Sequence, residues 1–129
     1  MPEHLVVGVA RFVWVLRQSR GLKDKRGAIR RIKDRVTARH NVSVAEVGSQ
    51  DDPQRAVLAI ALAGSDGRAV RSYLDRVLDT IDDMYIAPMA ERGIELITFG
   101  DNFGSEPIWP SNDTFDLIYD AEEPEDDAG

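Results

Sequence analysis

The chain has 129 residues, of which 43% are hydrophobic and 30% charged, with a formal net charge of −7 and no cysteine. This length suits a single domain with its own core, since domains commonly hold about 100–150 residues. Without cysteine the chain has no disulfide, no thiolate metal site and no cysteine nucleophile. The longest apolar run, residues 56–63, is far shorter than the ~20 residues that span a bilayer, and the start resembles no signal peptide. We therefore expect a soluble, cytoplasmic protein.

The first four predicted elements are a strand, a helix and two further strands. Residues 5–16 are rich in β-branched and aromatic side chains, which predicts a long strand. Apolar positions then recur at helical spacing from residue 22 to about residue 40. Residues 42–47 predict a short strand, and the apolar segment 56–63 predicts another one, buried on at least one face.

A second helix and a last strand complete the pattern. Ser65 and Asp66 can cap this helix, and Pro88 and Gly93 are expected to break it before a final strand at residues 94–99. Its apolar stripe consists of Val70, Tyr73, Leu74, Val77, Leu78, Ile81 and Tyr85. The order β-α-β-β-α-β predicts a ferredoxin-like α+β domain over residues 1–100, with a four-stranded antiparallel sheet and two helices on one face.

Three short motifs carry a resemblance to a known family. They are Gly-Leu-Lys-Asp-Lys-Arg at residues 21–26, Asn-Val-Ser-Val-Ala-Glu-Val at residues 41–47, and Gln-Asp followed by Gln-Arg-Ala within residues 50–56. Together they resemble the YlxP-like family of small bacterial proteins of unknown function, over about residues 5–99. The resemblance implies a ferredoxin-like fold, no established activity and a link to translation or ribosome assembly. Gly21 stands where the family usually has a helix-capping serine, and the residues after Gly100 lie outside the family pattern.

Charge is divided unevenly along the chain. Residues 1–100 contain every Lys and Arg and have a net charge of +3, whereas residues 101–129 have ten acids and no base. Residues 17–39 alone have a net charge of +8, and most of these bases fall on the first predicted helix. This concentration predicts contacts with phosphate groups, aided by the positive end of the helix dipole. The predicted nucleic-acid-binding residues are Arg20, Lys23, Arg26, Arg30, Lys33 and Arg35; the alternative is a solvated helix face that serves solubility.

Evidence for catalysis or metal binding is weak in the sequence. His4 and His40 have no ligand spacing, and His40 suits a helix C-terminus, where a cation interacts favourably with the dipole. Two pairs of adjacent acids, at residues 51–52 and 82–83, read more simply as solvated surface than as a cation site. No nucleotide-binding glycine motif or nucleophile elbow is present. We therefore expect no catalytic residues, no metal, no cofactor and no small-molecule substrate.

The sheet is expected to have one covered face and one open face. Phe12 and Trp14 share the face of their strand that we assign to the core, and the strand at residues 56–63 has no aromatic residue, so base stacking on the sheet is not expected. The opposite face is apolar and could be covered by a second copy, another protein or the chain's own C-terminal segment. We expect a homodimer. The predicted interface residues are Val7, Val9, Val13, Val15, Ala59, Ala61, Trp109 and Phe115.

The C-terminal region divides into two parts. Residues 101–119 contain several aromatic residues, which suggests that they dock on the domain or a partner, with an edge strand one possibility near residues 114–119. Residues 120–129 have the composition of a disordered acidic tail. This tail either mimics phosphate and masks the basic helix or only increases solubility.

The sequence thus predicts a non-enzymatic, RNA-binding or ribosome-associated protein that contacts structured RNA through its first helix. The alternative is a homodimeric protein-interaction module that uses the open sheet face and the C-terminal extension.

Overall fold

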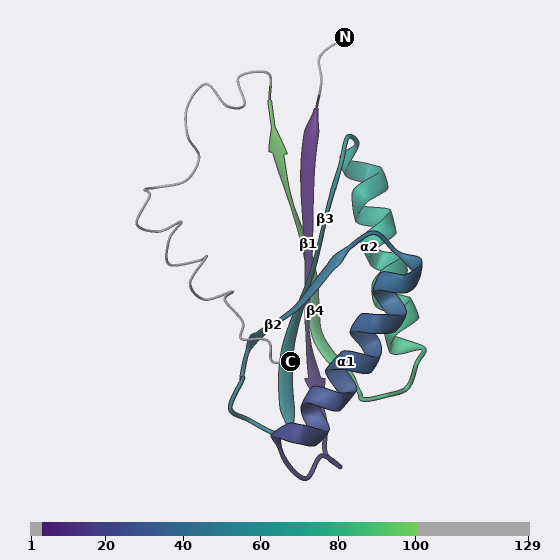
Figure 1. Cartoon of the computed structure of the whole chain (residues 1–129). Coiled ribbons are helices and arrows are strands. Elements are labelled where there is room, and N and C mark those ends of the chain that lie inside the picture. The colour runs from purple at the N-terminus through teal and green to yellow at the C-terminus, as the bar shows by residue number, and fades with distance from the viewer. Residues whose placement is uncertain (1–3, 101–129) are drawn as a thin grey trace.

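A computed structural model describes residues 4–100 and contains the six expected elements in the expected order (Figure 1). They are β1 (Leu5–Val15), α1 (Leu22–Arg39), β2 (Ser43–Gly48), β3 (Arg55–Gly64), α2 (Gly67–Asp82) and β4 (Met89–Phe99). The predictions for residues 101–119 and 120–129, including Trp109 and Phe115, lie outside the described residues.

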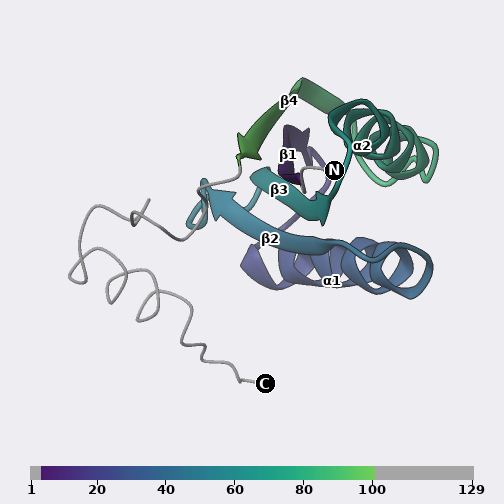
Figure 2. The same ribbon diagram turned by 90° about the horizontal axis from the view of Figure 1, so that it is seen from above.

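The four strands form one antiparallel sheet in the order β2-β3-β1-β4. β1 is therefore central: Val13 lies opposite Val57 of β3, and Leu5 lies opposite Phe99 of β4. Both helices lie on the same side of this sheet (Figures 1 and 2). The arrangement confirms the predicted ferredoxin-like fold.

The core lies between the sheet and the helices. Even-numbered residues of β1 point toward the helices, and Phe12 and Trp14 are fully buried there with their rings in a T-shaped contact at 6.0 Å. Gly8, on the same face, lets α2 pack closely, because a Cβ there would lie 2.4 Å from Val70 Cγ1. The face predicted to be the core is thus the one that the helices cover.

α2 begins as predicted but ends earlier. The Asp66 side chain accepts a hydrogen bond from the Ala69 N–H at 2.9 Å, so it is the N-cap. The helix ends at Asp82, before Pro88, and Tyr85 lies beyond it with φ 54° and 87% exposure. Assigning Tyr85 to the buried stripe was therefore wrong, because the chain leaves the helical path before reaching it.

β4 also differs from the prediction. It begins at Met89, five residues earlier than expected, so Gly93 lies inside a strand and breaks no helix. The pairing of β1 with β4 shifts between Arg11 and Val13, and Glu91 has φ 50° at this irregularity. A bulge of this kind hides the period-two pattern that identifies a strand from sequence.

Candidate nucleic-acid interface

All six cations predicted to bind nucleic acid are exposed. Arg20 precedes α1, and the other five lie on the helix itself. Within residues 4–100, none of the six side chains forms an ion pair or a hydrogen bond. Their positive charges are therefore available to a partner.

Helical geometry divides the exposed bases of α1 into two rows, one on each side of its outward-facing surface. At about 100° per residue, the buried residues Ala28, Ile32 and Val36 define the side that faces the core. The first row, named here the outer row, consists of Lys23, Arg26, Arg30 and Lys33. The second, the inner row, consists of Arg31, Arg35 and Arg39, spaced four residues apart.

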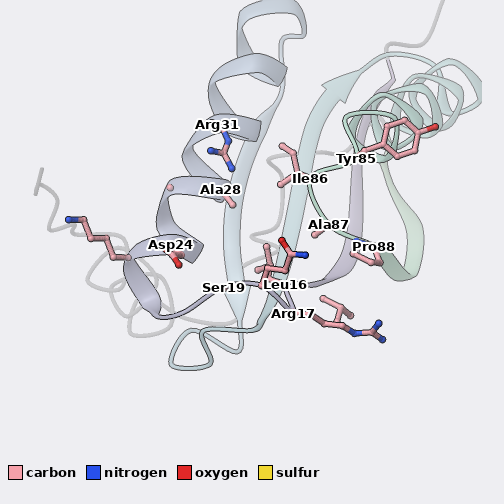
Figure 3. Close-up of a pocket in the computed structure, with 14 residues that line it drawn as sticks. Leu16, Arg17, Ser19, Asp24, Ala28, Arg31, Tyr85, Ile86, Ala87 and Pro88 are labelled. Carbon is pink, nitrogen blue, oxygen red and sulfur yellow. The ribbon is translucent and has the colours of Figure 1, made fainter.

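The inner row lines the groove between the two helices. Arg31 borders a cavity of about 890 Å³, and its guanidinium points into this space from α1, toward the side on which Ile86 lies (Figure 3). Arg35 and Arg39 border a second cavity of about 360 Å³, together with Thr80 of α2. The prediction included Arg35 but omitted Arg31 and Arg39, although their four-residue spacing could have been recognised in the sequence.

The larger cavity mixes basic and apolar groups (Figure 3). Its walls come from the loop after β1, the first half of α1 and the loop between α2 and β4. Its polar and small lining residues include Arg17, Lys23, Asp24, Gly27 and Arg31. Arg17, a further exposed base, was not among the predicted residues.

One base of α1 has a different role. The Lys25 side chain is only 1% exposed, and its Nζ lies 2.7 Å from Glu46 Oε2 of β2. The same Nζ donates to the backbone carbonyls of Ser49 at 2.8 Å, Arg55 at 3.2 Å and Gln50 at 3.3 Å. Lys25 therefore anchors α1 to the β2–β3 hairpin. Because this side of the helix packs against the hairpin, the neighbouring bases of α1 face outward.

The N-terminus of α1 is less suited to phosphate than the sequence indicated. Gly21 provides no side-chain cap, and the carboxylate of Asp24 accepts a hydrogen bond from the Arg20 N–H at 2.9 Å. This negative charge already lies in the first turn, where it interacts favourably with the helix dipole. The two basic rows are therefore the stronger candidate contacts.

The remaining candidates for chemistry are explained by packing. His40 Nδ1 lies 2.7 Å from the Tyr73 hydroxyl, so this histidine joins the end of α1 to α2. Within residues 4–100, no group of three or more His, Cys, Asp or Glu residues is arranged to hold a metal ion. No helix in that part of the chain is long and apolar enough to cross a membrane.

The predicted interface residues on the open sheet face differ in their exposure. Val7, Val9, Val15, Ala59 and Ala61 are half-buried and lie on the face without helices (Figure 2).

Val13 is only 3% exposed, so its prediction as an interface residue is wrong. It lies in the central strand between Val57 and Ala90, beside the bulge in the β1–β4 pairing. Its side chain therefore offers little surface to a partner. Ile97, which lies opposite Val7 and is 53% exposed, was missed because the predicted sheet-face residues came only from the first and third strands.

Comparisons with known proteins give a family but no activity. Residues 7–92 match DUF503, described as a protein of unknown function. The uncharacterized protein YlxP of Bacillus subtilis (strain 168) is 36% identical over 89 residues, which are 69% of this chain and 94% of that protein. The de novo designed protein Foldit4 aligns at 17% identity with a TM-score of 0.40, covering 75% of this chain and 97% of that one.

Proposed function

Because the chain belongs to the DUF503 family of proteins of unknown function, as its resemblance to YlxP-like proteins indicated, we propose a function from its own geometry. The protein is a non-catalytic RNA-binding protein whose first helix contacts the phosphate backbone of structured RNA. A role in association with ribosomal RNA is consistent with this chemistry.

The observation that carries the proposal is the set of nine exposed bases within residues 17–39. The tenth, Lys25, is the exception that is buried and paired. A surface that served solubility alone would mix both signs of charge, yet this segment has only Asp24 and Asp34 as acids. Concentrated and unpaired positive charge instead favours a polyanion.

The test is fluorescence-anisotropy binding of a structured RNA to the full chain at several salt concentrations. About six phosphate contacts give a log–log slope of about −4 to −5. Replacing Arg26, Arg30 and Lys33 together by Gln should reduce the steepness of the slope by about two to three.

The matched control makes the same charge change on α2, by replacing Arg68, Arg71 and Arg76 with Gln. This control should leave the slope unchanged. Loss of affinity equal to that of the α1 variant, or no binding of the wild-type protein at low salt, would contradict the proposal.

A second function is favoured by the open sheet face. Val7, Val9 and Ala61 form an apolar surface without a covering helix, and the exposed Ile97 extends it onto β4. Apolar sheet surfaces of this kind are suited to partner contacts, and a face-to-face dimer would bury this one. The protein is then a homodimer that presents α1 outward on each copy.

Sedimentation measurements on the full chain test this dimer. Wild-type protein should sediment as a dimer, and I97K should sediment as a monomer, because a buried lysine without a partner is unfavourable at an interface. T98K is the control, since Thr98 is exposed on the same strand but points to the other face. A wild-type monomer at micromolar concentration would exclude the dimer.

A further inference from the structure

The two basic rows of α1 border a third surface that faces away from the sheet. Continuing at about 100° per residue, Gly27, Asp34 and Ala38 fall between the outer and inner rows, and all three are exposed. We name these three residues the crown of α1. A partner that contacts both rows at once must pass over the crown.

Gly27 is the position in the crown where a partner can come closest to the helix backbone. A Cβ at Gly27 would meet no atom within 4 Å, so packing inside residues 4–100 does not require a glycine. Its backbone is helical, and glycine destabilises the middle of a helix relative to alanine. Lys23, Arg30 and Arg31 lie one helical turn away from Gly27, and Asp24 is a fourth exposed neighbour at that distance along the helix. The helix thus has a gap in its side-chain cover that is bordered by three positive charges and one negative charge.

Two separated rows of bases match an anion with two separated lines of charge. A single strand of RNA offers one line of phosphates, whereas a duplex offers one on each side of a groove. The minor groove of A-form RNA is wide and shallow, and proteins contact its 2′-hydroxyls and flanking phosphates. The minor groove of B-DNA is only about 6 Å wide, narrower than a helix with side chains at about 10 Å.

We propose that α1 binds double-stranded RNA with its crown over the minor groove, the outer row reaching the phosphates of one strand and the inner row those of the other. This inference rests on the proposed function and names its substrate class. Gly27 then allows the closest approach between the helix backbone and the groove, while Arg26 and Arg30 on one side and Arg31 and Arg35 on the other supply the phosphate contacts.

The experiment measures the affinity of the full-length protein for three nucleic acids of the same base sequence. They are an RNA duplex of about 20 base pairs, one of its single strands, and the corresponding DNA duplex. The wild-type protein should bind the RNA duplex at least about tenfold more tightly than either other probe. R26Q/R30Q and R31Q/R35Q should each weaken duplex binding and reduce the steepness of its salt slope by about two.

Variants of Gly27 test whether the RNA duplex must approach the helix backbone closely, because they add a side chain without changing the charge. Leucine is a good helix former, so G27L should raise the melting temperature while weakening binding to the RNA duplex about fivefold or more. It should leave single-strand binding unchanged. G93A is the control, because a Cβ at Gly93 of β4 also meets no atom within 4 Å but lies far from α1. G93A should not alter binding to any probe.

The outcomes distinguish the two proposals. If duplex and single strand bind equally and G27L has no effect, the duplex inference is wrong while RNA binding through α1 stands. Equal binding of RNA and DNA duplexes also overturns the inference, since α1 would then contact any polyanion. If no RNA binds to the wild-type protein at low salt, both proposals fail.

Discussion

The two helices lie side by side on the same sheet but are held there in different ways. α2 buries five apolar side chains, Val70, Leu74, Val77, Leu78 and Ile81, and its first turn is capped by Asp66. α1 buries only Ala28, Ile32 and Val36 together with the aliphatic stem and charged end of Lys25, and Gly21 gives it no side-chain cap. Most of the surface of α1 is therefore not committed to the fold, and this is where the exposed bases gather.

This difference in burial between α2 and α1 distinguishes residues that stabilise the fold from residues that are candidates for binding. Substitutions on α2 should affect stability before anything else. On α1, Lys25, the small apolar side and the helix-destabilising Gly27 should do so, whereas substitutions in the two basic rows should affect binding alone. Substitutions in both helices can test this division between effects on stability and effects on binding.

Leu74→Ala should destabilise the protein most. Leu74 is fully buried, and truncating such a leucine removes apolar burial and leaves a cavity, which costs about 3–4 kcal/mol. Chemical denaturation monitored by circular dichroism measures the loss. A change below about 1 kcal/mol would show that α2 contributes less to the core than its burial indicates.

Lys25→Met should come next, at about 3 kcal/mol, because it leaves the Glu46 carboxylate and three carbonyls without their shared donor. The residual 20% exposure of Glu46 moderates the effect by letting water reach the carboxylate. Glu46→Gln, which keeps an oxygen acceptor for the ammonium group, should cost less than half as much. Equal losses from both variants would show that the ion pair matters more than the carbonyl contacts.

Asp66→Ala should cost about 1 kcal/mol, the usual effect of losing an N-cap side chain. Gly21→Ser is the matched change on α1: it introduces the side-chain cap that the helix lacks, but it should stabilise the protein by only about a few tenths of a kcal/mol, because glycine is itself a tolerated N-cap residue. Thermal denaturation of both variants gives the comparison. If Gly21→Ser has no effect, the Asp24 carboxylate already stabilises that end of α1.

Replacing Arg26, Arg30 and Lys33 together by Gln should change the free energy of unfolding by less than about 0.5 kcal/mol, since these side chains make no ion pair within residues 4–100. The same variant should lose most of its RNA affinity. Denaturation and anisotropy measurements on one preparation check both results. A large loss of stability would place these bases in the fold rather than in a binding surface.

The sequence predicted the fold well because its strands and helices follow simple periodicities. The alternation along β1 identified Phe12 and Trp14 as core, and the acidic residue before α2 identified its cap. Predictions failed where local geometry breaks the period: Tyr85 follows the helix in a left-handed conformation, and β4 contains a bulge.

The candidate site was only partly predictable for a related reason. Lys25 looks in the sequence like any other base of residues 17–39, and only the position of Glu46 and the carbonyls of the β2–β3 hairpin shows that it is buried. The four-residue spacing of Arg31 and Arg39 is visible in the sequence, but only the position of α2 shows that their row faces the groove between the helices. The burial of Val13 could not be read from the alternation along β1, which places it on the face without helices.

The central place of β1 has a consequence for how the protein is made. The eleven residues of this strand precede every other element of the domain, yet its neighbours are β3 and β4, and the pairing of Leu5 with Phe99 joins the first strand of the domain to its last. Pairings between such distant residues form slowly, and an unpaired apolar strand can associate with the wrong edge. Until β3 has emerged from the ribosome, β1 has no strand to pair with, and its second neighbour, β4, follows later still. The nascent protein is therefore most prone to aggregation before β3 has emerged, and one edge of β1 stays unpaired until β4 follows.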